Sequence, residues 1–79
     1  MIDEEKTSQK TGVFLVKNST PQNLLLVLEF WGDEHVIAPG GSLRIRYKGP
    51  AESDVEIEAK ADRLIIYGWT GSLLEVQGD

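Results

Sequence analysis

Two stretches of strict alternation, lying between positions 43 and 60, constrain the fold more than any other feature of the sequence. From Leu43 to Lys48 apolar side chains alternate with basic ones, and from Val55 to Lys60 they alternate with mainly acidic ones. A period of two places successive side chains on opposite faces of an extended chain. Both stretches are therefore predicted to be β-strands with one buried face, which predicts an all-β protein.

Turn signals divide the rest of the sequence into further short strands. The strongest is Pro39 followed by Gly40, because Pro fixes φ at the second turn position and Gly accepts positive φ at the third, as a type II turn requires. The predicted strands cover residues 13–17, 24–30, 35–38, 43–48, 54–60, 63–67 and 72–77. Such spacing, roughly 8–12 residues, is typical of small sandwiches and barrels. We expect a seven-stranded antiparallel β-sandwich of immunoglobulin- or cupredoxin-like outline, with a small closed barrel as the alternative.

The length of 79 residues corresponds to one domain, and the hydrophobic content of 41% is that of an ordinary globular chain. Apart from Met1 and Ile2, residues 1–11 are polar or charged, so we expect a flexible N-terminal arm, followed by a single β domain over residues 12–79.

The charge balance argues against two classes of partner. Eight basic residues stand against 13 acidic ones, a net charge of −5. Nucleic acids and anionic membranes are bound through a basic surplus, so neither is expected as a partner. The basic stripe of Arg44, Arg46 and Lys48 is expected to be neutralised by the next strand, whose Glu56 and Glu58 are expected to form cross-strand ion pairs.

The chain contains no cysteine. Disulfide scaffolding, thiolate zinc sites, thiol catalysis and the blue copper chemistry of cupredoxins are therefore excluded. The N-terminal residues lack the basic start and apolar stretch of a signal peptide, and the longest apolar run, Leu24 to Leu28, is too short to cross a bilayer. These features predict a cytoplasmic protein.

Side chains suited to catalysis are few. The single histidine, His35, follows Asp33 and Glu34, which is a weak pattern for a metal ligand set or an oriented general base. An enzyme built on these three residues and Glu29 remains an alternative without an identifiable substrate. We expect no catalytic residues, no metal site and no cofactor, and so a protein that is not an enzyme.

Several strands carry more apolar residues than a sandwich needs, since each strand of a two-layer fold requires only one apolar face. Leu25 and Val27 oppose the other leucines of their strand, and Ile65 opposes Leu64 and Ile66. Three explanations of these extra apolar residues are open. They are covered by the arm and loops, they form a homo-oligomer interface, or they line a pocket or groove. The leading hypothesis is a non-enzymatic module that binds a protein partner, or a second copy of itself as a homodimer. Its expected contacts are Leu25, Val27 and Ile65, with Trp31 and Trp69 at the rim.

Two tryptophans, Trp31 and Trp69, each adjoin a glycine at a predicted strand end. They are predicted to lie at one end of the domain. There they either form an aromatic platform or close the end of the core. The platform supports an alternative function, a domain that binds a small ligand such as a carbohydrate.

Overall fold

The computed structural model describes residues 8–77, and it is all-β, with seven strands and no helix among those residues. The strands are β1 (Gln9–Lys17), β2 (Leu24–Glu29), β3 (Asp33–Ile37), β4 (Ser42–Pro50), β5 (Glu56–Ala59), β6 (Arg63–Tyr67) and β7 (Leu73–Gln77). Each overlaps one predicted strand. In the part of the chain described, no helix is long and apolar enough to cross a membrane.

The start of β1 bears on the predicted arm. Because β1 begins at Gln9, the last residues of the segment predicted as a flexible arm are strand. They pair with the end of β4, where Gln9 lies opposite Pro50. Residues 1–7 lie outside the described residues.

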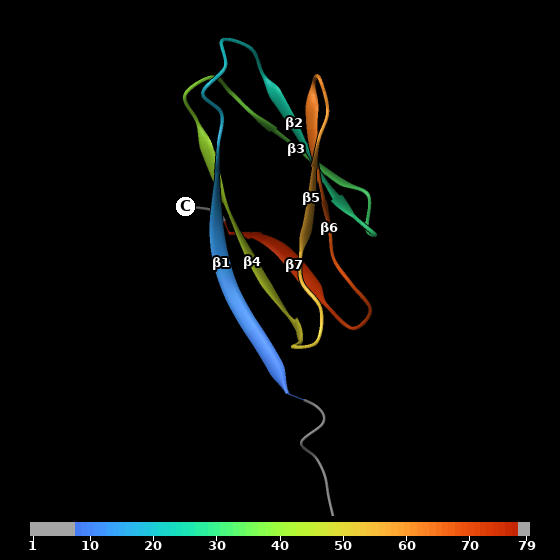
Figure 1. Cartoon of the computed structure of the whole chain (residues 1–79). Coiled ribbons are helices and arrows are strands. Elements are labelled where there is room, and N and C mark those ends of the chain that lie inside the picture. Colours follow the sequence, from blue (N-terminus) through green and yellow to red (C-terminus); the bar gives the residue numbers. More distant parts are fainter. Residues whose placement is uncertain (1–7, 78–79) are drawn as a thin grey trace, which may run out of the picture.

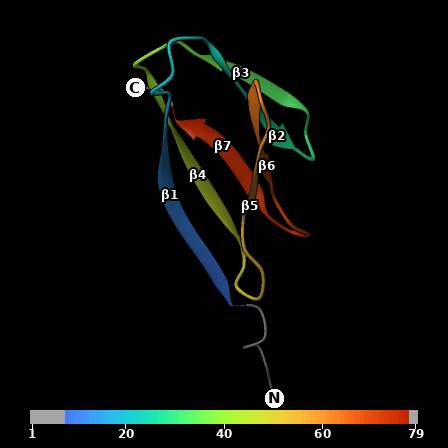
Figure 2. The same ribbon diagram turned by 45° about the horizontal axis from the view of Figure 1, so that its top comes forward.

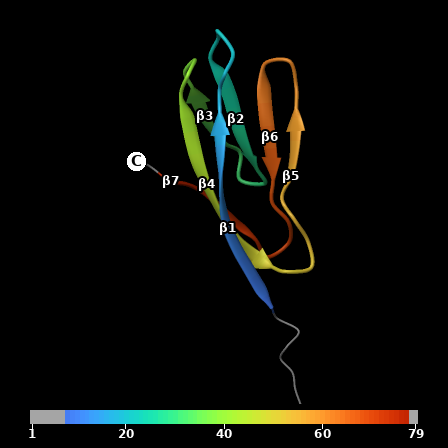
Figure 3. The same cartoon turned by 60° about the vertical axis from the view of Figure 1, so that its left-hand side comes forward.

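The strands form two separate sheets. One has three strands in the order β1-β4-β7, and the other has four in the order β3-β2-β6-β5, as Figures 1, 2 and 3 show from different sides. The described residues form no closed barrel, because each sheet keeps two free edges. The expectation of a wholly antiparallel arrangement is wrong at one place, since β2 and β6 pair in parallel.

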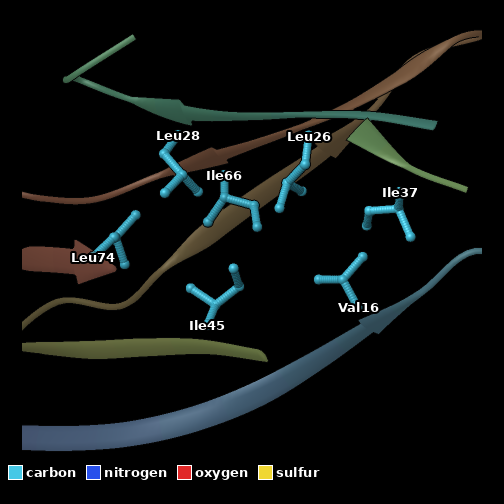
Figure 4. Packing of buried hydrophobic residues seen from close by; sticks show 7 residues of the cluster. All are labelled: Val16, Leu26, Leu28, Ile37, Ile45, Ile66 and Leu74. Atoms are coloured by element: carbon cyan, nitrogen blue, oxygen red, sulfur yellow. The ribbon is translucent and has the colours of Figure 1, made fainter. Parts of the chain in front are cut away.

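The core lies between the two sheets, and both contribute to it. Figure 4 shows the side chains of the two layers pointing toward one another. The three-stranded sheet supplies Val16, Ile45 and Leu74, and the four-stranded sheet supplies Leu26, Leu28, Ile37 and Ile66. Leu26, Ile45 and Ile66 have no exposed surface. Four partly buried side chains of the same three strands also pack against this core, Phe14, Leu43, Tyr47 and Val76. Alternation places the side chains between these inward-facing ones on the outer side of the molecule.

The position of β2 explains its composition. It is a central strand, which lies between β3 and β6, and its first five residues form an apolar run. A central strand has neighbouring side chains on both sides of each residue, so apolar groups on its outer face are shielded as well. Val27, on the outer face, is only 6% exposed.

The turn between β3 and β4 has the predicted form. Gly40 has φ of +81°, and the amide of Gly41 donates to the carbonyl of Ala38 over 2.8 Å, as expected when Pro39 holds the second turn position. The turn is tied to the end of β1, because Asn18 N donates to Gly41 O and Gly40 N donates to Asn18 O, at 2.9 and 2.8 Å.

Candidate functional site

The predicted contact residues lie together on the outer face of the four-stranded sheet. Val27 on β2 is directly opposite Ile65 on β6, and Leu25 is opposite Val36 on β3. Leu25 and Ile65 are half-buried, whereas Val36 is 63% exposed. Within residues 8–77 all seven strands belong to the two facing sheets, so none is left to cover this apolar row.

Carboxylates border the apolar row on both sides and at the Glu29 end, whereas Arg63 lies opposite Leu25 at the other end. We call the outer face of β3, β2, β6 and β5 the acidic face; its members follow from strand parity and register. Its charged residues are four glutamates and one arginine, Glu29, Glu34, Glu56, Glu58 and Arg63, and its apolar residues are Leu25, Val27, Val36, Ile65 and the ring of Tyr67. The face therefore combines an apolar centre with a negative surround.

The opposite side of the molecule has the reverse charge. We call the outer face of β1, β4 and β7 the basic face. Its charged residues are four cations and one anion, Lys17, Arg44, Arg46, Lys48 and Glu75, and three large apolar side chains lie beside them, Val13, Leu15 and Leu73. These three are 52, 56 and 50% exposed.

The predicted neutralisation of the basic stripe by the following strand is wrong. Glu56 and Glu58 belong to β5, which pairs with β6 in the other sheet and not with β4. Among the described residues the one ion pair made by Arg44 or Arg46 joins Arg46 Nε to Glu75 Oε1 at 4.0 Å. An exposed ion pair at that distance contributes little to stability and neutralises little charge. The positive charges of β4 therefore remain on the solvent-exposed surface.

An open hollow of about 400 Å³ lies at the β5 end of the acidic face. Its lining combines two rings with two carboxylates: Phe30, Glu56, Ile57, Glu58, Tyr67 and Gly68. Phe30 is 69% exposed. The hydroxyl of Tyr67 donates to Glu58 Oε1 over 2.9 Å, and this hydrogen bond is the main cause that raises the pKa of Tyr67 above its usual 10.0.

The two tryptophans lie at one end of the domain, as predicted, but in different settings. Trp69 is half-buried; its Nε1 donates to Pro50 O over 2.9 Å, and its ring meets Tyr47 edge-on at 6.3 Å between centroids. The ring of Trp69 therefore closes this end of the core. Trp31 is 43% exposed, and its ring lies so close to Gly68 that a Cβ there would come within 3.0 Å of it.

The sequence cluster around His35 does not converge in space. Asp33, Glu34 and His35 are consecutive residues of β3, so Glu34 lies on the face opposite to its two neighbours. In residues 8–77 no group of three or more His, Asp or Glu side chains is placed to hold a metal ion. The absence of catalytic, metal and cofactor sites stays a prediction.

Sequence reasoning missed two exposed apolar residues near the predicted contacts. Val36 extends the apolar row, and Phe30 lines the hollow at its end. Val36 had a usable signal, because it alternates with the inward-facing Ile37 in a short strand. The sequence predicts Phe30 as the last residue of a strand, and this position does not indicate a surface role.

Comparisons with known proteins leave these two faces as the basis for assigning function. No protein-family model matches the chain, and no curated protein and no solved structure is significantly similar to it.

Proposed function

We propose that this chain is a non-enzymatic protein-interaction module that associates through its acidic face. The observation that carries the proposal is the apolar row of Leu25, Val27 and Ile65 on the outer side of a sheet, continued by Val36 with 63% of its surface exposed. The strands beside β2 shield Val27, but they leave Val36 exposed. Because a sheet of a two-layer fold needs an apolar inner face only, the exposed part of this row requires a different cause.

The layout of the face matches that of a protein interface. Interfaces have a desolvated apolar centre and a polar rim that stays hydrated. Here Val27 and Ile65 form the centre, while Glu34 and Glu56 are exposed on the outer strands. Burying the row removes apolar surface from water, and the glutamates at its border select a partner by charge.

The two facing sheets support the proposal that the module is a β-sandwich. The immunoglobulin- or cupredoxin-like outline stays a prediction. The parallel pairing of β2 and β6 differs from a fully antiparallel version of that outline. The absence of cysteine supports a place in the cytoplasm.

The test is a double substitution on the apolar row, Val36→Lys with Ile65→Lys. Neither residue is fully buried, so the folded domain is expected to persist, as judged by circular dichroism and thermal unfolding. Association is measured by size-exclusion chromatography with light scattering over a concentration series, and by capture of partners from a lysate of the cells that make the protein. Both kinds of association are expected to be lost.

The matched control adds the same charge elsewhere. Ala38→Lys with Ala61→Lys alters two exposed residues outside both faces, and it should associate as the wild type does. If the Val36 and Ile65 variant also associates normally, the acidic face is not the interface. If it unfolds, the row belongs to the core and the proposal loses its basis.

A second candidate, binding of a small ligand such as a carbohydrate, is favoured by the exposed ring of Phe30 beside Tyr67 in the hollow. Trp31 lies against Gly68, which also lines the hollow, so its fluorescence would report occupancy. A response to a member of a glycan panel that is lost in Phe30→Ala would support this function. Silence across the panel would reject it.

A further inference from the structure

We propose that the partner of the acidic face is the basic face of a second copy of this chain, so that copies stack front to back. This inference rests on the proposed function and names the partner. Its ground is that one molecule carries two outer faces of opposite sign, on opposite sides of the same core.

Charge is the first argument. The acidic face has four glutamates and a single arginine, and the basic face has four cations and a single glutamate. Each surplus is therefore balanced only when an acidic face meets a basic one. Arg44, Arg46 and Lys48 all lie exposed along the central strand β4, where carboxylates of another copy can reach them.

Apolar surface is the second argument. Val13 and Leu15 on β1 and Leu73 on β7 flank the cations and are each at least half exposed. The acidic face has its own apolar row with Val36 exposed beside it. A contact between the two faces would bury apolar side chains of both together with paired charges, whereas a contact of either face with a small ion would leave the apolar part in water.

The hollow on the acidic face gives the contact a specific element. It combines the carboxylates of Glu56 and Glu58 with the rings of Phe30 and Tyr67. A guanidinium is bound by this combination, through charge-assisted hydrogen bonds to carboxylates and stacking on aromatic faces. Arg44 and Arg46 of the neighbouring copy are the side chains of this kind on the basic face.

The charge pattern also decides the symmetry. A two-fold dimer would set acidic face against acidic face, or basic against basic, and like charges facing one another across an interface are destabilising. A front-to-back contact is heterologous and leaves one free face at each end of the pair. The average mass of the assembly is therefore expected to grow with protein concentration beyond that of a dimer. Added salt should weaken the association because it screens the charges.

The experiment uses charge reversal in the full chain, at exposed residues of each face. The basic-face variant is Arg44→Glu with Arg46→Glu, and the acidic-face variant is Glu34→Lys with Glu56→Lys. Glu58 is left intact because it accepts the hydrogen bond of Tyr67. Light scattering at low and high salt measures association, and circular dichroism verifies folding.

Wild type is expected to associate at low salt and to dissociate at high salt. Each variant alone should show an apparent dissociation constant raised about tenfold or more, because its two faces now carry the same sign. The variant that combines all four substitutions should regain association, since reversing both faces restores their complementarity. A 1:1 mixture of the two variants should also associate.

Three outcomes would overturn the inference. They are a wild type that stays monomeric at every concentration at low salt, association unaffected by the basic-face variant, and no recovery in the combined variant. A fourth concerns another occupant of the basic face, the acidic N-terminal residues. If Asp3→Asn, Glu4→Gln and Glu5→Gln together abolish association, that segment is the occupant and the inference fails.

These results separate the inference from the proposed function. A monomeric wild type whose lysate partner is lost in Val36→Lys with Ile65→Lys rejects stacking but keeps the interaction module. Self-association that is weakened by Arg44→Glu with Arg46→Glu but unchanged by Val36→Lys with Ile65→Lys would show that the apolar row is not the contact.

Discussion

Asn18 is the one polar residue among those described whose side chain is completely buried. Its Nδ2 donates to the carbonyls of Gln22 and Ile37, both over 2.8 Å. Its Oδ1 accepts from the amide of Thr20 at 3.0 Å and from the hydroxyl of Thr20 at 2.7 Å. Both donors and both lone pairs of the amide are therefore used, and the side chain joins the loop after β1 to the end of β3.

Replacing Asn18 is expected to destabilise the domain far more than its place in a loop indicates. Asn18→Ala would leave the buried carbonyl of Ile37 without that partner, and we expect a loss of about 2–4 kcal/mol in the free energy of unfolding. Urea unfolding of the variant measures it. Asn23→Ala, an exposed asparagine of the same loop, is the control and should change stability by less than about 0.5 kcal/mol. Equal effects at the two positions would contradict this role of Asn18.

The burial of Asn18 was not predictable from alternation, because its residue type and its neighbours indicate an exposed turn. The sequence did hold one relevant signal. A Thr two residues after an Asn permits the side chain of the Asn to accept from the backbone at that position, as in an Asx turn. The contact with Ile37, 19 residues away, depends on tertiary structure and leaves no local pattern.

At the scale of strands, alternation identified which side chains face outward but not which strands pair. The outward placement of Arg44 and Arg46 on β4 was predicted correctly. Their expected pairing with Glu56 and Glu58 failed because the chain crosses to the other sheet after β4. Strands that follow one another in sequence are neighbours in roughly two-thirds of cases, so sequence order alone does not decide a sheet.

The pairing of β5 with β6 has a consequence that titration can measure. The hydrogen bond from Tyr67 to Glu58, together with desolvation and the Glu58 charge, raises the pKa of the Tyr67 phenol above 10.0. Glu58→Gln removes the negative charge and is expected to lower that pKa toward 10.0. Tyrosinate absorbance in a Tyr47→Phe background follows Tyr67 alone. An unchanged titration curve in the Glu58 variant would show that the bond does not form in solution.

The same shift sets the sign of a stability change with pH. The folded state holds the Tyr67 proton more tightly than the unfolded chain does, so the contribution is fully present below pH 10.0. It is lost as pH rises from there through the raised pKa of the folded state. Stability of the wild type should therefore fall more steeply across that alkaline range than stability of Glu58→Gln.

At the scale of the whole molecule, the two faces owe their opposite signs to topology. The sequence has a basic stripe and an acidic stripe on strands that follow each other. Had those strands paired, the charges would have cancelled within one sheet. Because β4 and β5 belong to different sheets, the net charge of −5 conceals two outer surfaces of opposite sign. Net charge alone does not predict this separation of charge between two faces.

The shared core implies that the two sheets unfold together. The inward side chains of each sheet pack against those of the other, and Ile45 of β4 and Ile66 of β6 are both fully buried there. Two tryptophans report on the process from different places. Trp69 contacts Tyr47 of the three-stranded sheet, whereas Trp31 lies in the connection between β2 and β3. Single-tryptophan variants, Trp31→Phe and Trp69→Phe, thus give one reporter for each layer.

Ile45→Val, introduced into both single-tryptophan backgrounds, tests this coupling. Removing one methylene from the core is expected to lower the free energy of unfolding by about 0.5–1.5 kcal/mol. Because the core belongs to both sheets, the one tryptophan signal of each background should show a single urea transition. Ile45→Val should lower the free energy of unfolding by the same amount in both backgrounds. A shift confined to the Trp69 signal would contradict a single cooperative unit. It would mean that the three-stranded sheet, which contains Ile45, loses its structure while the four-stranded sheet remains folded.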